Sequence, residues 1–269
     1  MMLTGEQDMV WKTIGFEEEN GLALVRLNRP EALNALDLQM AQDLYEVCER
    51  CCEPDIRAMV LSGAGRAFCA GGDLKEIEGR IRAGERMEEF LWPDYQKSLA
   101  KLYEVRCPTI AAVHGFAVGA GCDIALACDI RLAGAGASFG QVYSRVGLVP
   151  DCGGTFFLPR VVGSAKALEL ILTGDVIDAE AALSIGLVRS VHNDDALMEE
   201  AIALGRRLAE GPSVALRAAK KLIRSSGGLD VATALRAEAG AQAETVASLD
   251  FQEGIAAFLE KRKPGFQGK

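Results

Sequence analysis

Short apolar runs alternate with amphipathic stretches over about the first two thirds of the chain. An apolar run bounded by turn residues is typical of a buried strand, and apolar positions three or four apart indicate a helix. The predicted strands are residues 11–18, 22–28, 56–62, 109–113, 130–133 and 187–192. Because they alternate with helices, the pattern predicts an α/β core with parallel strands, opened by a hairpin at residues 19–21.

Helical spacing covers most of the remaining chain. The predicted helices are residues 38–52, 84–105, 122–128, 164–174, 178–186, 196–210, 213–225, 231–248 and 251–262. Asp37 is the predicted N-cap of the first, and Pro93 should start, kink or end the second. The strand-free last quarter predicts a helical region that buries its apolar face against a neighbouring subunit. We therefore divide the chain into an α/β core, residues 1–204, and a helical oligomerisation region, residues 205–269.

Two glycine-rich turns follow predicted strands. The first is residues 64–73, after the run 56–61, and the second is Gly119-Ala120-Gly121, after the run 108–113. A strand that breaks at glycine and restarts as a helix leaves backbone N–H groups exposed, and these favour a negative charge. We therefore expect the two turns to place two N–H donors on one oxyanion.

Charge and composition narrow the ligand classes. The chain is 49% hydrophobic and 25% charged, as in ordinary globular proteins, and its formal charge is −9. Such a chain repels nucleic acid and anionic membranes, so an anionic ligand needs a local basic group. The apolar window Thr109–Ile130 is long enough for a membrane span, but it contains His114, Asp123 and Asp129, so we reject a span.

The eight cysteines raise the question of disulfides or a metal site. The N-terminal residues have no apolar signal segment, which predicts reduced thiols and a cytoplasmic location. Cys48 and Cys51 have metal-ligand spacing, but they share a helical apolar stripe and no second Cys-x-x-Cys is present. We interpret them as structural thiols and expect no metal.

Nucleotide motifs fit poorly, whereas one hydrolase motif matches. The paired glycines at residues 63, 119 and 134 lack the third glycine of a dinucleotide loop, and no phosphate-loop motif occurs. Gly136-Ala-Ser138-Phe-Gly140 matches the nucleophile elbow, with Asp175 or Asp178 and then His192 in a suitable order. Five-residue matches arise by chance in a chain with 29 glycines, so we keep a Ser138 hydrolase as a minor alternative.

Two carboxylates lie beside the glycine turns. Asp151 precedes Cys-Gly-Gly-Thr in an apolar setting, where burial would raise its pKa into a useful acid–base range. The plainer interpretation of Asp151 is an N-cap, and that of Asp123 is a first-turn carboxylate that accepts from backbone donors. Together with two N–H donors, the pair suits proton transfer next to an activated carbonyl such as a thioester.

Several long motifs resemble one family. They are Leu27-Asn-Arg-Pro-Glu-Ala-Leu-Asn-Ala-Leu36, Ala67-Phe-Cys-Ala-Gly-Gly-Asp-Leu-Lys75, His114-Gly-Phe-Ala-Val-Gly-Ala-Gly-Cys-Asp123, Phe139-Gly-Gln, Gly153-Gly-Thr155 and residues 253–263. In this order they are similar to the crotonase (enoyl-CoA hydratase/isomerase) superfamily over nearly the whole chain. Residues 146–155 with Leu158-Pro-Arg160 most resemble the phenylacetate-pathway epoxide or ring acyl-CoA isomerases.

This resemblance implies a spiral of strand-strand-helix units and a homotrimer, or a dimer of trimers, formed through the helical C-terminal region. It also implies an acyl-CoA substrate and no cofactor beyond the CoA moiety. The implied thioester oxygen lies between the N–H groups of Gly72 and Ala120. The implied CoA-binding residues are Ala70 and Leu74 at the adenine, Arg29 and Lys75 at the phosphates, Asp73 in the same stretch, and Phe258 and Lys261 from a neighbouring subunit.

The chain departs from the family pattern at its acid–base positions. Hydratases of the family carry glutamates where Asp123 and Tyr143 stand in this chain. Isomerases of the family carry an acid at the position of Asp151. Dienoyl-CoA isomerases carry aspartates at the positions of Asp123 and Asp151 and a glutamate at the position of Tyr143. We therefore predict an acyl-CoA isomerase in which Asp151 moves the proton and Asp123 assists or orders a water. A hydratase, a thioester hydrolase and a non-catalytic acyl-CoA-binding protein stay as alternatives, and the acyl group is open.

Overall fold

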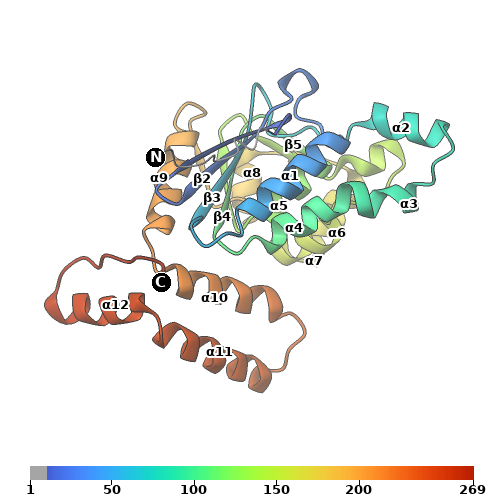
Figure 1. Cartoon of the computed structure of the whole chain (residues 1–269). Helices are drawn as coiled ribbons and strands as arrows, with labels where there is room; N and C mark the ends of the chain where they lie inside the picture. Colours follow the sequence, from blue (N-terminus) through green and yellow to red (C-terminus); the bar gives the residue numbers. More distant parts are fainter. Residues whose placement is uncertain (1–10) are drawn as a thin grey trace, which may run out of the picture.

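The computed structural model describes residues 11–269 and contains a six-stranded sheet that forms its centre (Figure 1). The strand order is β1-β2-β3-β4-β6-β9. The strands are β1 (Ile14–Glu19), β2 (Leu22–Leu27), β3 (Ala58–Gly63), β4 (Thr109–Val113), β6 (Ile130–Gly134) and β9 (Ser190–His192). Only β1 and β2 pair antiparallel, and the other neighbours in this sheet are parallel. The predicted hairpin and the predicted parallel core are therefore confirmed.

Both faces of this sheet are covered, which explains why its strands are continuous apolar runs. Met59 and Leu61 of β3 pack in the larger core with α1 (Leu38–Arg50), α4 (Lys97–Glu104) and α5 (Ala120–Ala127). Ala58 and Val60 point to the opposite face and pack under α9 (Leu197–Ala209). The side-chain period of two thus divides one strand between two cores.

A second, three-stranded sheet lies beside the first and was not predicted. It consists of β5 (Phe116–Val118), β7 (Ser138–Gly140) and β8 (Val176–Asp178), in the order β5-β7-β8. Each strand has three residues, too short for a period-two pattern to be visible in the sequence. Long-range pairing therefore creates these strands.

The segment between β3 and β4 is helical, and its first part, residues 74–82, has no predicted element. Helix α2 (Leu74–Arg82) precedes α3 (Met87–Phe90), the π-helical turn η2 (Leu91–Gln96) and α4. Pro93 lies in η2, in agreement with its predicted effect on helical geometry. Helix α2 has little signal in the sequence because it buries no residue and its apolar stripe is short.

The remaining elements connect the two sheets and complete the α/β core. They are η1 (Pro30–Ala32), η3 (Val142–Val146), α6 (Gly154–Val162), α7 (Ser164–Thr173) and α8 (Ala179–Ser184). The predicted end of α7 is confirmed, since Gly174 has left-handed backbone angles there, and so is the predicted start of α8, since the Asp178 side chain caps it. Helix α8 ends at Ser184, before the predicted Gly186.

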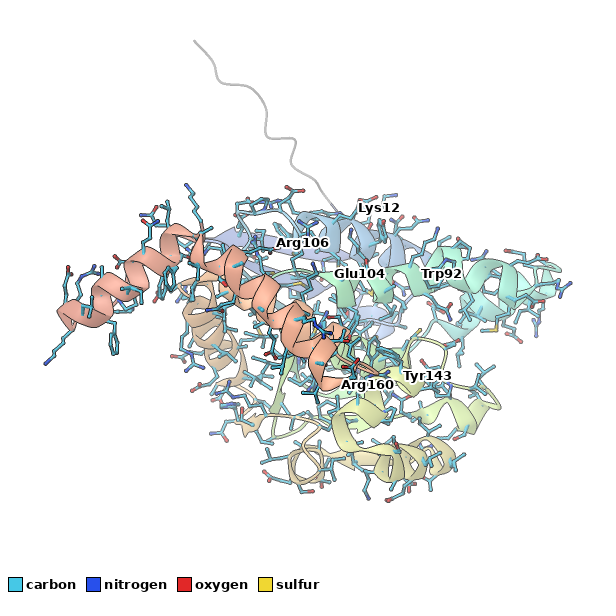
Figure 2. The ribbon with its side chains drawn as sticks, turned by 90° about the horizontal axis from the view of Figure 1, so that it is seen from below. Lys12, Trp92, Glu104, Arg106, Tyr143 and Arg160 are labelled. Carbon is cyan, nitrogen blue, oxygen red and sulfur yellow. The ribbon has the colours of Figure 1, made fainter. Side chains whose placement is uncertain are left out.

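Three helices extend away from the sheets at the C-terminal end, in orange and red in Figure 1: α10 (Ser213–Ser225), α11 (Val231–Val246) and α12 (Leu249–Glu260). The division predicted between residues 204 and 205 falls inside α9, which packs on the central sheet. Helix α10 binds the core through polar contacts, such as that of Arg224 with Asp129 at 2.6 Å. Helix α11 buries no residue, and from below it crosses in front of the core, whereas α12 extends to the left of the core (Figure 2).

Within residues 11–269, no helix has the length and apolar character needed to cross a membrane. The apolar window Thr109–Ile130 folds as β4, β5 and α5, followed by the first residue of β6.

Candidate active site

The two glycine turns lie side by side, joined by a parallel bridge between Cys69 and Ala117. The amide of Cys69 donates to the carbonyl of Phe116 at 2.9 Å, and the amide of Val118 donates to the carbonyl of Cys69 at 3.2 Å. A Cβ atom on Gly121 would lie 2.0 Å from the Cys69 carbonyl oxygen, so only glycine permits this approach. We call residues 70–73 the first glycine loop and residues 118–121 the second.

Each loop presents one unused amide. Gly119 has φ +54° and ψ −127°, and its carbonyl accepts the first hydrogen bond of α5, from the amide of Asp123 at 3.1 Å. Among the loop, turn and cap hydrogen bonds of residues 11–269, neither the Gly72 amide nor the Ala120 amide is a donor. Both residues line the same cavity. The structure thus brings together the two predicted oxyanion donors.

The cavity between the loops has a volume of about 380 Å³ and a mostly apolar wall. Its lining residues are Leu36, Ala70, Gly71, Gly72, Leu74, Ile77, Leu91, Tyr95, Phe116, Val118, Gly119, Ala120, Val142, Tyr143, Arg145, Val146, Leu148, Asp151, Cys152 and Val176. Asp151 is the one carboxylate among these described residues. An apolar cavity with a few converging polar groups is the usual form of a small-molecule site.

Asp151 has the environment of an acid–base group. Burial raises its pKa, opposed by hydrogen bonding with the side chains of Cys152 and Tyr143. Its backbone carbonyl accepts from Gln96 Nε2 at 2.6 Å, which fixes the segment before α6. Gly153, with no side-chain cap, precedes α6, so the N-cap interpretation of Asp151 is wrong.

Asp123 lies behind the cavity wall and does not line the cavity. It is fully buried; its Oδ2 accepts from the Tyr143 hydroxyl at 2.8 Å and its Oδ1 from Gln141 Nε2 at 2.7 Å. Burial raises the pKa of Asp123 to about 7, against the lowering effect of these two donors. We expected nearby backbone amides to donate to Asp123. Instead, its hydrogen bonds come mainly from the side chains of Gln141 and Tyr143, which are distant in the sequence.

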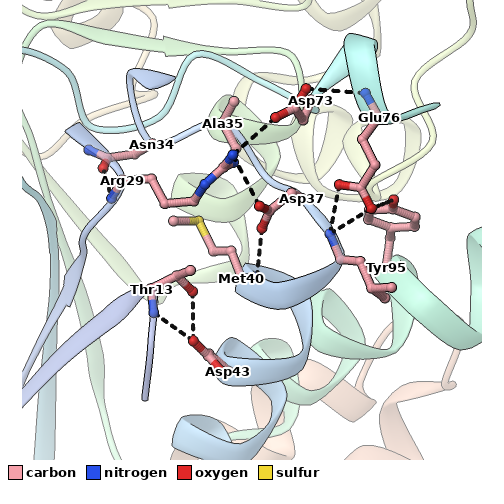
Figure 3. Close-up of polar contacts among 11 residues, drawn as sticks. Thr13, Arg29, Asn34, Ala35, Asp37, Met40, Asp43, Asp73, Glu76 and Tyr95 are labelled. Atoms are coloured by element: carbon pink, nitrogen blue, oxygen red, sulfur yellow. Dashed lines mark hydrogen bonds and ion pairs between the residues drawn. The ribbon is translucent and has the colours of Figure 1, made fainter. Parts of the chain in front are cut away.

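Charged side chains fix the first glycine loop (Figure 3). The Arg29 guanidinium contacts Asp37 and Asp73 at 3.1 Å each and donates to the Ala35 carbonyl at 2.5 Å. Asp37 caps α1 and Asp73 caps α2, so Arg29 links the starts of two helices. The N-cap predicted at Asp37 is confirmed. Arg29, predicted to bind CoA phosphates, is engaged within the protein.

The other residues implied to bind CoA are divided between two places. Ala70 and Leu74 line the cavity, and Lys75 is exposed on α2 next to Leu74. Phe258 and Lys261 belong to the end of α12 and are exposed, outside the cavity lining of this chain. Their implied position at the CoA of a neighbouring subunit stays a prediction.

The Ser138 hydrolase is contradicted by the geometry. Ser138 begins β7 rather than standing between a strand and a helix, and its Cα partner across the strand pair is Asp178. His192 lies at the edge of the other sheet, where its ring contacts the Ser190 hydroxyl at 2.8 Å. The proposed serine, histidine and aspartate therefore do not form a triad, and we discard this alternative.

The two thiols with metal-ligand spacing are buried, as their place in the helical apolar stripe predicted. Cys48 and Cys51 are buried in the larger core, and burial raises the pKa of both, which makes them poor metal ligands and nucleophiles. Within residues 11–269 no three His, Cys, Asp or Glu residues gather as a metal site would require.

A second cavity shares Asp151 with the first and was missed by sequence reasoning. It has a volume of about 400 Å³ and is lined by Trp92, Gln96, Leu99, Ala100, Tyr103, Pro150, Asp151, Cys152, Gly153, Thr155, Phe156 and Phe157. Trp92 and Tyr143, labelled in Figure 2, belong to the two different cavities. No local pattern in the sequence points to this cavity, because η2, α4 and α6 meet only in the folded chain.

Comparisons with known proteins identify the family of this chain. The enoyl-CoA hydratase/isomerase family model matches residues 17–269. The chain is 39% identical over 257 residues to the 1,2-epoxyphenylacetyl-CoA isomerase of Escherichia coli, covering 93% of this chain and 97% of that protein. It is 40% identical over 261 residues to a Rhodobacter capsulatus protein named "Probable enoyl-CoA hydratase", covering 97% and 100%.

Solved structures agree as well. The crystal structure of an enoyl-CoA hydratase from Bacillus anthracis is 34% identical, with a TM-score of 0.89 over 96% of this chain and 100% of that one. The chain belongs to the enoyl-CoA hydratase/isomerase family and has the crotonase fold.

Proposed function

We propose that the protein is an acyl-CoA isomerase that shifts a double bond or rearranges a ring next to the thioester. The observation that carries the proposal is Asp151, a carboxylate of raised pKa in the same apolar cavity as the unused amides of Gly72 and Ala120. A thioester oxygen between these amides would gain negative charge at low cost as an enolate forms.

The reaction needs only groups that this cavity supplies. With the thioester oxygen at the two amides, the α-proton becomes acidic and Asp151 removes it. Asp151 then returns a proton to another carbon of the delocalised enolate. A raised pKa serves both steps, because the same carboxylate must accept a proton and donate it again. CoA enters as part of the substrate, and we propose no further cofactor.

The single carboxylate favours isomerisation over water addition. By the family pattern described above, hydratases place two glutamates at the site. This chain has Tyr143 at one of those positions, in the cavity wall, and Asp123 at the other, buried behind that wall. Hydration is the second candidate, because relatives of similar identity are named enoyl-CoA hydratases.

The test follows the absorbance of the conjugated thioester when the protein meets a 3-enoyl-CoA. We expect conversion to the 2-enoyl isomer, and at least about a hundredfold slower conversion with Asp151→Asn, since general acid–base catalysis contributes roughly 10²–10⁴-fold. Asp195→Asn, an exposed carboxylate outside both cavities, is the matched control and should convert at the wild-type rate.

Three results would redirect the proposal. Unchanged turnover with Asp151→Asn removes Asp151 from the mechanism. Loss of the conjugated absorbance of a 2-enoyl-CoA, with no isomerisation, makes the protein a hydratase. Tight CoA binding without turnover of either substrate indicates a non-catalytic acyl-CoA-binding protein.

Assembly into a trimer, or a dimer of trimers, is part of the proposal. It is supported by large apolar side chains exposed along α10–α12, which a folded chain normally covers. These are Ile223, Val231, Leu235, Val246, Leu249, Phe251, Ile255, Phe258 and Leu259.

A further inference from the structure

A tyrosine and a buried carboxylate form a hydrogen-bonded pair in the cavity wall. The Tyr143 ring lines the cavity, and its hydroxyl donates to Asp123 Oδ2 at 2.8 Å. Gln141 fixes the other carboxylate oxygen at 2.7 Å. Among the described residues that line the cavity, Tyr143 is the one that hydrogen-bonds Asp123.

No ion pair to Asp123 occurs among residues 11–269, although buried carboxylates are normally paired with a cation. Gly154 closes the remaining side, where an added Cβ would lie 2.6 Å from Asp123 Oδ1. A buried carboxylate without a cation destabilises the fold when ionised, which is expected where the group has a functional role.

The Tyr143–Asp123 pair also lies beside the second glycine loop, which forms part of the cavity wall. The Tyr143 Cζ atom is 3.9 Å from the point where a Cβ on Gly119 would stand, so the phenol end of the ring is next to the second glycine loop. Asp151 lines the same cavity, and hydrogen bonding with Tyr143 is among the causes that lower its pKa. Tyr143 and Asp151 thus line one cavity, where a single substrate can meet both side chains.

We propose that Tyr143 is the second proton-transfer group of the site and that Asp123 is a positioning residue that holds the proton Tyr143 delivers. This inference rests on the proposed isomerase function. Asp151 removes a proton from one carbon, and the electrons of that C–H bond form the enolate. Tyr143 gives its hydroxyl proton to the second carbon, while the proton of the neutral Asp123 carboxyl passes to the phenol oxygen.

The proton balance closes over one turnover. After the transfer Asp151 is protonated, Tyr143 is again a phenol and Asp123 is ionised. Asp151 then releases its proton to water, and Asp123 regains one through Tyr143. The titration of Asp123 near neutrality allows both of its forms at physiological pH.

A merely structural pair would behave differently. If the hydrogen bonds only join η3 to α5, Asp151 alone carries the proton from one carbon to the other. A deuterium removed from the first carbon then reaches the second. With the relay, the second carbon receives a solvent-derived proton from Tyr143 instead.

The experiment uses a 3-enoyl-CoA carrying two deuterium atoms on the carbon next to the thioester, in ordinary water. The product is analysed by NMR for deuterium at the carbon that gains the proton. We expect little deuterium there with the wild-type protein and a several-fold rise with Tyr143→Phe and Asp123→Asn. Both variants should also turn over about 10–100-fold more slowly.

Tyr45→Phe is the matched control, because Tyr45 belongs to α1 and lines neither cavity. Circular dichroism confirms folding, and the nearly isosteric Asp123→Asn tests the relay if Tyr143→Phe does not fold. Equal deuterium transfer in wild type and either variant, at similar turnover, overturns the relay and leaves the isomerase function intact. A wild type that converts none of the substrate overturns the isomerase function itself.

Discussion

The two glycine loops present equivalent amides to one cavity, yet different forces position them. In the first loop, Asp73 directly follows Gly72 and is fixed by Arg29, whose side chain is 18% exposed. In the second loop, Gly119 and Gly121 are fixed by backbone hydrogen bonds and by contact with the Cys69 carbonyl. Backbone hydrogen bonds hold both loops; the first loop adds ion pairs through Arg29, and the second adds the closest backbone approach, which only glycine permits.

This difference indicates how each loop responds to change. Partly exposed ion pairs stabilise modestly, weaken in salt and tolerate small movements. A close backbone contact is insensitive to salt but intolerant of one added carbon. The second loop also begins α5, which carries the buried Asp123, so its stability should depend on pH through that residue.

The largest expected effect is the pH dependence caused by Asp123. Its pKa is about 7 in the folded chain against a usual 3.8, so the folded state binds the extra proton between these values. This extra proton stabilises the folded state. Its contribution to the free energy of unfolding, roughly 4 kcal/mol, is fully present below about pH 4 and is lost as pH rises through 7. Urea unfolding of wild type and Asp123→Asn from pH 4 to 8 should show wild type losing stability relative to the variant. Parallel pH profiles would contradict this.

The next effect is steric and concerns the second loop. Gly121→Ala places a Cβ 2.0 Å from the Cys69 carbonyl oxygen and must separate the two loops. We expect a loss of about 3 kcal/mol in unfolding free energy and, as the Ala120 amide moves, roughly 10²–10³-fold lower turnover. In the control Gly79→Ala, within α2, nothing lies within 4 Å and stability should rise by about 0.5–1 kcal/mol. Wild-type turnover of Gly121→Ala would show that the loops need not touch.

The smallest effect is expected from the ion pairs of Arg29 with Asp37 and Asp73 at the first loop. Arg29→Met leaves Asp37 and Asp73 without their shared cation, and we expect a loss of about 1–3 kcal/mol because these side chains are partly exposed. The difference from wild type should shrink in high salt, as measured by thermal unfolding. An unchanged melting temperature with a raised KM for the acyl-CoA would instead assign Arg29 to the CoA phosphates.

Local signals in the sequence predicted much of the fold. The caps at Asp37 and Asp178, the glycine after α7 and the central strands are confirmed because nearby residues determine them. The three-residue strands β5, β7 and β8 escaped prediction, since their pairing partners lie far away in the sequence. Helix α9 shows the same limit: its spacing predicted a helix, but only its packing under the sheet shows that it belongs to the core.

The sequence by itself determined the family, the residue types of the site and the two glycine turns, because these depend on short contiguous motifs. Only the tertiary structure decided how those residues are arranged. It placed Asp151 in the cavity, Asp123 behind Tyr143, and Arg29 between two helix caps. The reason is physical: burial and hydrogen bonding set the pKa and reach of a carboxylate, and both depend on residues brought together from distant parts of the chain.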